Sequence, residues 1–248
     1  MKILVCISAV PDTTSKINFT ADQKSFDTGG VQFVINPNDE FGLTRAVWFK
    51  EQQGAEVHIA TVGAASVEPI MRKALAIGAD KAFRIDTHPL DGFLVANTLS
   101  EHIKTEHYDL VICGRESIDY NGNMVPGLIA NHCNFAFINT CTSLTVDGNK
   151  ATATREIDGG SETLETQLPL VVGAQKGLVE ESDLKIPNMR GIMSARTKPL
   201  EIITPSSLET LTEDLSFEKP DSKGAITLVD EANIDQLIEL LHKEAKVL

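Results

Sequence analysis

Short apolar runs alternate with amphipathic segments along most of this chain, and no other feature restricts its fold as strongly. Runs with strand-like composition occur at residues 2–7, 56–62, 81–85, 109–114 and 168–174. Helical spacing of apolar residues occurs between them at 38–53, 67–77 and 91–104. Strands that alternate with helices form a parallel sheet covered on both faces. We therefore predict an α/β fold with a doubly wound, mostly parallel sheet.

The alternation changes after Pro126. A short helix is predicted at 128–132, and residues 141–168 alternate between polar and apolar side chains as antiparallel strands do. Turn residues separate these strands at 147–148 and 158–160, where Asp and Gly occur together. An antiparallel strand section is therefore predicted within the α/β fold.

The last part of the chain has a different composition. Beyond Val172 the sequence is loop-like, and beyond Pro205 it is polar until an amphipathic helix predicted at 233–245. That helix has one apolar stripe, which needs another surface to bury it. We expect a nucleotide-binding domain over 1–200 and an extended C-terminal arm over 201–248, whose helix packs on a partner subunit.

Charge and residue usage exclude several classes of protein. The chain has 22 Lys and Arg against 35 Asp and Glu, a formal net charge of −13, so we do not expect it to bind nucleic acid or anionic lipid. It has no apolar run long enough to cross a bilayer and no recognisable leader, so we expect a cytoplasmic protein without membrane insertion.

Motifs for catalysis and metal binding are missing from the sequence. The four cysteines form no CxxC pair, and the six histidines have no ligand spacing. Neither GxSxG nor HExxH is present, and the Walker and GxGxxG patterns are missing as well. We expect neither an enzyme active site nor a metal site.

Three loops are candidates for ligand binding, because ligands collect beyond the carboxyl ends of strands in open α/β sheets. Residues 8–15 are rich in hydroxyl groups, which is also typical of a polar connection. Residues 36–39, Asn-Pro-Asn-Asp, offer a helix start to adenine or phosphate, and they are equally what an ordinary capped helix contains. Residues 114–127 can surround phosphate oxygens with amides, unless they are simply a solvent-exposed loop.

Several segments resemble the electron-transfer flavoprotein β family over essentially the whole chain. They are VCISAVPD, NPNDEFGLTRA, GADKAFRI, DLVICGRESID, REIDGGSETLETQLPLVVGAQ and IPNMRGIMSARTKPLEI. The REIDGG segment is the most specific, because its Arg, its Asp-Gly-Gly turn, its Glu and the later Leu-Pro have the family's spacing.

This resemblance implies an adenine-nucleotide α-hydrolase-like fold and a heterodimer with an α subunit that holds FAD. The β chain of the family binds AMP or, in electron-bifurcating members, a second FAD. Carried over to this sequence, the cofactor-binding positions are Cys6, Asn36, Pro37, Asn38, Asp39, Val62, Gly63, Ser117, Ile118, Asp119, Tyr120, Asn121, Gly122, Asn123, Met124 and Val125.

The resemblance also implies two contact regions. Pro11, Asp12 and Thr13 correspond to the edge that approaches the flavin held by the α subunit. A recognition loop for acyl-CoA dehydrogenase-type partners corresponds to Leu184, Ile186, Pro187, Asn188 and Met189, with Ile186 at the anchor position.

The chain departs from the family pattern in three places. Asn123, Met124 and Val125 follow Gly122 where many relatives have Gln, Val or Thr, and Gly. The residues Met-Arg-Gly at 189–191 lengthen the recognition loop. Thr13 replaces an aromatic residue found in some relatives.

We expect an electron carrier, not an enzyme, that passes electrons from acyl-CoA dehydrogenase-type flavoenzymes of fatty acid oxidation to a quinone oxidoreductase. The sequence leaves open whether the nucleotide is AMP or a second FAD, and hence whether the protein bifurcates electrons. A stand-alone nucleotide-binding regulator resembling universal stress proteins is an alternative, although it would not need the REIDGG segment or the arm. An ATP pyrophosphatase-type enzyme would require a Ser- and Gly-rich loop after the first strand, and residues 8–11 do not form such a loop.

Overall fold

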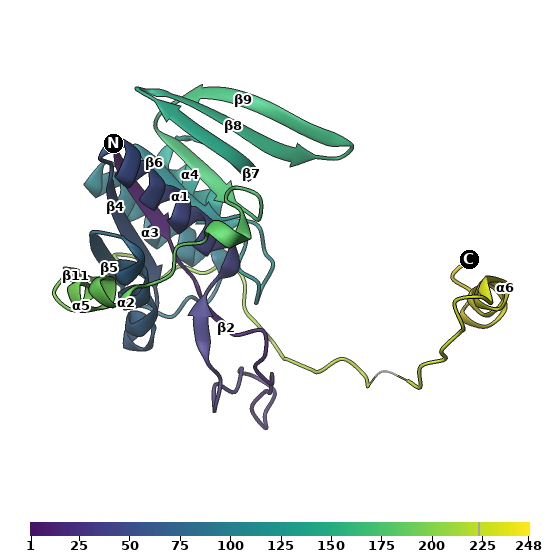
Figure 1. The fold of residues 1–248 in the computed structure, drawn as a ribbon. Coiled ribbons are helices and arrows are strands. Elements are labelled where there is room, and N and C mark those ends of the chain that lie inside the picture. Colours follow the sequence, from purple (N-terminus) through teal and green to yellow (C-terminus); the bar gives the residue numbers. More distant parts are fainter. Residues whose placement is uncertain (223) are drawn as a thin grey trace.

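The computed structural model describes residues 1–222 and 224–248, and its centre is one twisted sheet with helices on both faces (Figure 1). The strand order is β11-β5-β4-β1-β6-β10-β7-β8-β9. The pairs from β11 to β7 are parallel, whereas β7, β8 and β9 pair antiparallel. This confirms the predicted doubly wound, mostly parallel α/β fold with an antiparallel section.

The parallel strands are β1 (Lys2–Cys6), β4 (Glu56–Val62), β5 (Lys81–Ile85), β6 (Leu110–Gly114), β10 (Leu170–Ala174) and β11 (Leu200–Ile203). The strand β7 (Ala136–Asp147) leaves the parallel part and forms the antiparallel section with β8 (Lys150–Ile157) and β9 (Gly160–Gln167). The main helices are α1 (Pro37–Gln53), α2 (Glu68–Ile77), α3 (Gly92–Glu106) and α4 (Val125–Cys133).

Successive residues of each central strand are buried on opposite faces of the sheet. Ile3 and Val5 of β1 pack in the core that α1 and α2 cover, whereas Leu4 and Cys6 pack in the core that α3 and α4 cover. Strands buried on both faces need near-continuous apolar sequence, which is why these runs were recognisable.

The sheet has a topological switch point beside β1. The chain passes from β1 to β4 and β5 on one side and then returns to β6 on the other side. Cys6 and Cys113, near the carboxyl ends of β1 and β6, are register partners. In sheets of this type the crevice for a ligand opens at this point, outside the carboxyl ends of the strands.

Beyond β10, a helix and a strand lie where the sequence indicated only a loop. The helix α5 (Met189–Ala195) packs against α2, and β11 adds a parallel strand beside β5. Gly191 permits the helix contact, because a Cβ at this position would collide with the carbonyl oxygen of Ala76. Both elements are short and partly exposed, so they lack the periodic apolar pattern that predicts a helix or strand.

A separate two-stranded sheet precedes α1. It pairs β2 (Ala9–Pro11) with β3 (Phe33–Ile35) antiparallel, and the long connection between them protrudes from the body (Figure 1).

The arm predicted at 201–248 begins inside β11 and then extends away from the sheet (Figure 1). It ends in α6 (Ile234–Glu239), which continues as a π-helix over Leu240–Ala245, so the predicted helix at 233–245 is confirmed. Within the described ranges, no helix has the length and apolar character needed to span a membrane.

Candidate functional site

Asp39 is the centre of the candidate site at the switch point. Its side chain is 2% exposed, and its two carboxyl oxygens accept backbone hydrogen bonds from different strand ends. Oδ2 accepts from the N–H of Ser8 at 2.8 Å, and Oδ1 accepts from the N–H of Gly114 at 2.7 Å. Burial raises the pKa of Asp39 to about 7, although these hydrogen bonds act in the opposite direction. One side chain of α1 thus joins the ends of β1 and β6.

Two asparagines hold the loop that follows β6. The amide nitrogens of Asn36 and Asn38 donate to the carbonyl of Glu116 at 3.0 and 3.1 Å. The Oδ1 atom of Asn36 accepts from the N–H of Ile118 at 3.2 Å. Asn36 makes no side-chain capping bond to α1, so the Asn-Pro start does more than cap its own helix. These hydrogen bonds fix residues 116–118 against the start of α1.

Gly114 is required by close packing in this arrangement. A Cβ at position 114 would lie 2.8 Å from Nδ2 of Asn36 and from Cβ of Asn38, and it would also collide with Oδ1 of Asp39. Real Cβ atoms do not approach other atoms that closely, so a larger residue would displace the three side chains that define the site.

The rest of the loop after β6 is shaped by left-handed backbone conformations. Asn121 and Asn123 have φ values of +49° and +47°, which asparagine tolerates better than most residues. Asn123 is further held by Asn139, whose Nδ2 donates to its Oδ1 at 2.7 Å. Val125 is the first residue of α4 and does not have a positive φ. A β-branched residue is therefore compatible with the backbone at the position where the family resemblance implies glycine.

The segment that follows β4 lies at the same edge of the sheet. The N–H of Gly63 donates to the carbonyl of Ile85 at 3.0 Å, and the carbonyl of Gly63 accepts from Arg84 at 2.9 Å. Arg84 is 4% exposed and also pairs with Glu68 and Asp86. Arg84 was not among the predicted site residues, although a cation inside the otherwise apolar part of the strand KAFRI was a visible signal.

Under this edge of the sheet, the core covered by α3 and α4 is apolar. Cys6 and Cys113 are buried there, and Val62 packs against the same core. A hydrogen bond with Cys6, together with burial, raises the pKa of Cys113 well above its ordinary value. The protonated thiol of Cys113 is neutral and behaves as a small hydrophobe.

The structure gathers the predicted cofactor-binding residues from four separate segments at one edge of the sheet. Cys6 lies at the end of β1, residues 36–39 span the start of α1, Val62 ends β4 and Gly63 follows it, and residues 117–125 lead from β6 into α4. The hydrogen bonds of Asp39, Asn36 and Asn38 connect three of these segments directly.

Pro11 ends β2, and Asp12 stabilises the turn that follows it. The Oδ1 atom of Asp12 accepts from the hydroxyl of Thr14 at 2.5 Å and from the N–H of Thr14 at 2.8 Å, and these two hydrogen bonds lower the pKa of Asp12. The small β2–β3 sheet begins two residues after Ile7, which is bonded to β4. The proposed flavin-facing residues therefore adjoin the candidate site.

The predicted docking residues lie elsewhere, between β10 and the end of α5. Ile186 and Met189 are 80% and 75% exposed. Leu184 instead packs against the core covered by α1 and α2, and Asn188 caps α5 through a 2.8 Å bond from the N–H of Gly191. The three extra residues, 189–191, form the first turn of α5. Of these candidates, Ile186 and Met189 are therefore the exposed apolar side chains.

Two shallow cavities do not coincide with the candidate site. One, of about 360 Å³, lies at the amino-end edge of the sheet and is lined by residues that include Tyr108, Asp109 and Pro169. The other, of about 340 Å³, lies on the antiparallel strands. Both are open and lack the convergent backbone groups found around Asp39. Within residues 1–222 and 224–248, no three His, Cys, Asp or Glu side chains are grouped as metal ligands would be.

Comparison with known proteins identifies a consistent set of relatives. A family model described as Electron transfer flavoprotein domain matches residues 24–208. The Electron transfer flavoprotein subunit beta of Syntrophomonas wolfei is 32% identical over 252 residues, which cover 100% of this chain and 98% of that protein. The corresponding subunit of Bacillus subtilis is 32% identical over 262 residues and covers 100% of both chains. The human subunit is 33% identical over 223 residues, 87% of this chain and 86% of the relative.

Proposed function

Because this chain belongs to the electron transfer flavoprotein family and matches its β subunits over the full length, we propose that it is one half of a heterodimeric electron carrier. Its partner is an α subunit that holds the redox-active FAD. This chain binds an adenine nucleotide at the carboxyl edge of its sheet and presents a docking segment to other flavoenzymes.

Asp39 joins β1, α1 and β6, and this contact is the main support for a nucleotide site. Bonds from Ser8 and Gly114 to one buried side chain hold two strand ends in place at the switch point. A preorganised crevice costs less to fill than one that must be ordered on binding.

The residues at this edge have the chemistry that an adenine nucleotide requires. In the first turn of α4, Pro126 has no N–H, but the N–H groups of Val125 and Gly127 have no intrahelical acceptor, so they are available to a phosphate. Loop 117–123 adds the hydroxyl of Ser117, the phenol of Tyr120 and short amide side chains, which bind phosphate oxygens without net positive charge. Val62 is partly exposed and packs against the core that contains Cys6 and Cys113, so its side chain offers an apolar contact to the adenine ring.

We propose AMP as the nucleotide, with a second FAD in its place as the alternative. When bound, FAD supplies the electron-transfer chemistry of the complex. This chain contributes binding and orientation through residues 36–39 and 117–125, and its edge at 11–13 faces the flavin of the α subunit. In the proposed role, electrons arrive from acyl-CoA dehydrogenase-type flavoenzymes and leave toward a quinone oxidoreductase.

Exposed apolar side chains support two protein contacts. Ile186 and Met189 project from a short segment that α5 and the contact of Leu184 with the core hold in place, as a transient docking anchor requires. The distal arm, residues 234–248, exposes a second set of apolar side chains, of which Ile234, Leu237 and Ile238 are 63%, 44% and 50% exposed. We assign the distal arm to the α subunit, because an isolated helix with an apolar stripe is not stable without a surface to cover it.

Co-expression with the neighbouring gene for a candidate α subunit tests this function. We expect a yellow heterodimer that releases an adenine nucleotide on denaturation. One flavin per heterodimer together with AMP identifies the structural nucleotide, whereas two flavins identify the bifurcating type. A colourless, stable monomer that hydrolyses ATP would contradict the carrier assignment and favour a nucleotide-binding regulator.

A further inference from the structure

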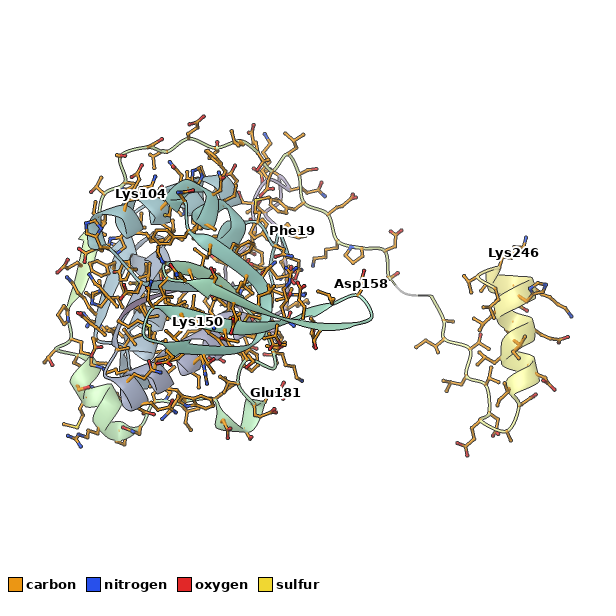
Figure 2. The ribbon with its side chains drawn as sticks, turned by 90° about the horizontal axis from the view of Figure 1, so that it is seen from above. Phe19, Lys104, Lys150, Asp158, Glu181 and Lys246 are labelled. Atoms are coloured by element: carbon orange, nitrogen blue, oxygen red, sulfur yellow. The ribbon has the colours of Figure 1, made fainter. Side chains whose placement is uncertain are left out.

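Residues 206–219 form a strap that crosses the same edge of the sheet as the candidate nucleotide site. The strap leaves β11 on one side of the sheet and runs toward the connection between β2 and β3, which carries Phe19 (Figures 1 and 2). It has no helix or strand of its own and is largely exposed. Its position is therefore fixed by a small number of specific contacts with the body.

Asp91 makes the strongest of these contacts. Its Oδ1 atom caps α3 by accepting from the N–H of Leu94 at 2.8 Å. Its Oδ2 atom accepts from the N–H groups of Leu211 and Thr212 at 2.7 and 2.9 Å. One carboxyl oxygen of Asp91 therefore binds the start of α3, and the other binds the strap. Ser206 adds an earlier contact, a 2.7 Å bond from its hydroxyl to Glu101 on α3.

The Asp91 contact is adjacent to the predicted nucleotide loop. A Cβ added to Gly92, the next residue, would lie 2.8 Å from Cγ of Met124. The start of α3 therefore packs directly against the end of loop 117–125. Further along the strap, Asp214 lies 3.5 Å from the phenol oxygen of Tyr120, which belongs to the same loop. The strap thus passes over the loop in two places.

The far end of the strap is held by the segment that follows the proposed flavin-facing residues. Phe217 stacks on Phe19 with a centroid distance of 5.2 Å and an interplanar angle of 20°. The N–H of Phe217 donates to the carbonyl of Gln23 at 2.8 Å, and Lys219 donates to Asn18 at 2.6 Å. The strap is therefore anchored on both sides of the crevice, at Asp91 and at Phe19.

We propose that the strap retains the adenine nucleotide, and that Asp91 and Phe217 are the positioning residues that hold it closed. This inference rests on the proposed function, because it assigns a role to the strap at that same site. An exposed segment held by point contacts opens locally at low free-energy cost. Nucleotide release would then follow the opening of the strap, without unfolding of the sheet.

The test uses the complete heterodimer and two substitutions. Asp91→Asn keeps an oxygen for the cap of α3 but places an NH₂ group where Oδ2 accepted the two strap amides. Phe217→Ala removes the stack from an exposed position and leaves the core intact. The bound nucleotide is chased with an excess of isotopically labelled AMP, and its release is followed by mass spectrometry. Lys243→Ala, on the distal π-helix, is the matched control.

We expect each variant to release the nucleotide about 5-fold faster than the wild type and the double variant more than 10-fold faster. The flavin absorbance of the α subunit and the melting temperature of the heterodimer should be unchanged. If Asp91→Asn lowers the melting temperature, Phe217→Ala alone decides the question. Equal release rates in the wild type and Phe217→Ala would overturn the strap's role. A wild-type heterodimer that contains no adenine nucleotide would overturn the proposed function and the strap's role together.

Discussion

Asp39 and Gly114 are 75 residues apart, yet Oδ1 of Asp39 accepts a 2.7 Å hydrogen bond from the backbone N–H of Gly114. The same carboxyl group accepts from Ser8, so one buried side chain positions the ends of both strands that flank the switch point. The strands β1 and β6 already pair through Cys6 and Cys113, and Asp39 adds a connection from α1 to both strand ends. The geometry of the candidate site therefore depends on this contact.

Asp39→Asn should change how stability depends on pH. Burial raises the pKa of Asp39 to about 7 in the folded chain, against 3.8 for an ordinary Asp side chain. Between these values the folded state keeps a proton that the unfolded state has lost, so stability falls as pH rises, by up to about 1.4 kcal/mol per pH unit. Asparagine does not titrate, so the stability of the variant does not fall with pH for this reason.

Urea unfolding of both proteins at pH 4, 5, 6 and 7 measures the difference. The stability of the variant relative to the wild type should increase with pH across this range. His102 contributes in the opposite direction, because burial lowers its pKa to about 4, but it is present in both proteins and cancels. A difference that stays constant from pH 4 to pH 7 would contradict the raised pKa of Asp39.

Gly114→Ala should destabilise the fold by about 1–3 kcal/mol and reduce nucleotide content, because its methyl group would occupy the space of the Asp39 and Asn36 side chains. The midpoint of urea unfolding and the nucleotide released per heterodimer are the two measurements. Gly160→Ala is the control, since a Cβ there meets no atom within 4 Å and its φ is outside the left-handed range. Equal effects of the two substitutions would show that close packing at 114 is unimportant.

Ile186→Ala should slow reduction of the heterodimer by an acyl-CoA dehydrogenase-type partner about 10-fold, because truncating an apolar anchor at a docking site costs more than 1 kcal/mol. Flavin content should be unchanged. Stopped-flow absorbance of the flavin gives the rate. Ile202→Ala is the control, as Ile202 is 58% exposed on β11 and outside the docking segment. Parallel loss of flavin and rate would identify residues 184–189 as structural.

Replacing both Leu237 and Ile238 with Asp should weaken association with the α subunit at least 10-fold, because two charges would then enter an apolar contact. Sedimentation or titration calorimetry of the separated subunits measures the dissociation constant. Lys243→Ala is a mild control, since it removes only a 2.8 Å ion pair with Glu239 on the same helix. Unchanged association of the double variant would place the α6 stripe outside the subunit interface.

The sequence could predict the sheet because its strands are buried on both faces. Runs such as DLVICG are almost entirely apolar, as a strand buried on both faces requires. The helices between them have clear end signals such as Gly54, which adopts a left-handed conformation at the end of α1. The glycines at 148 and 159 likewise have positive φ values in the turns between β7, β8 and β9. These are local constraints, so they are visible in a single segment of sequence.

Short and exposed elements could not be predicted in the same way. The helix α5 exists because Gly191 can approach the end of α2, and β11 exists because it extends the edge beside β5. Arg84 is fixed by Gly63, Glu68 and Asp86 together, and its role depends on all three. Each of these features depends on a partner that the local sequence does not specify.

By itself, then, the sequence determined the layered α/β fold, the antiparallel section, the terminal helix and the loops at which a ligand could bind, because periodicity and turn chemistry act over a few residues. Only the tertiary structure decided that Asn36 binds the loop after β6 instead of capping its own helix, and that Asp91 joins α3 to the strap. The physical reason is that a buried hydrogen bond requires both partners to be brought together, and folding alone places Asp39 beside Gly114 and Asp91 beside Thr212.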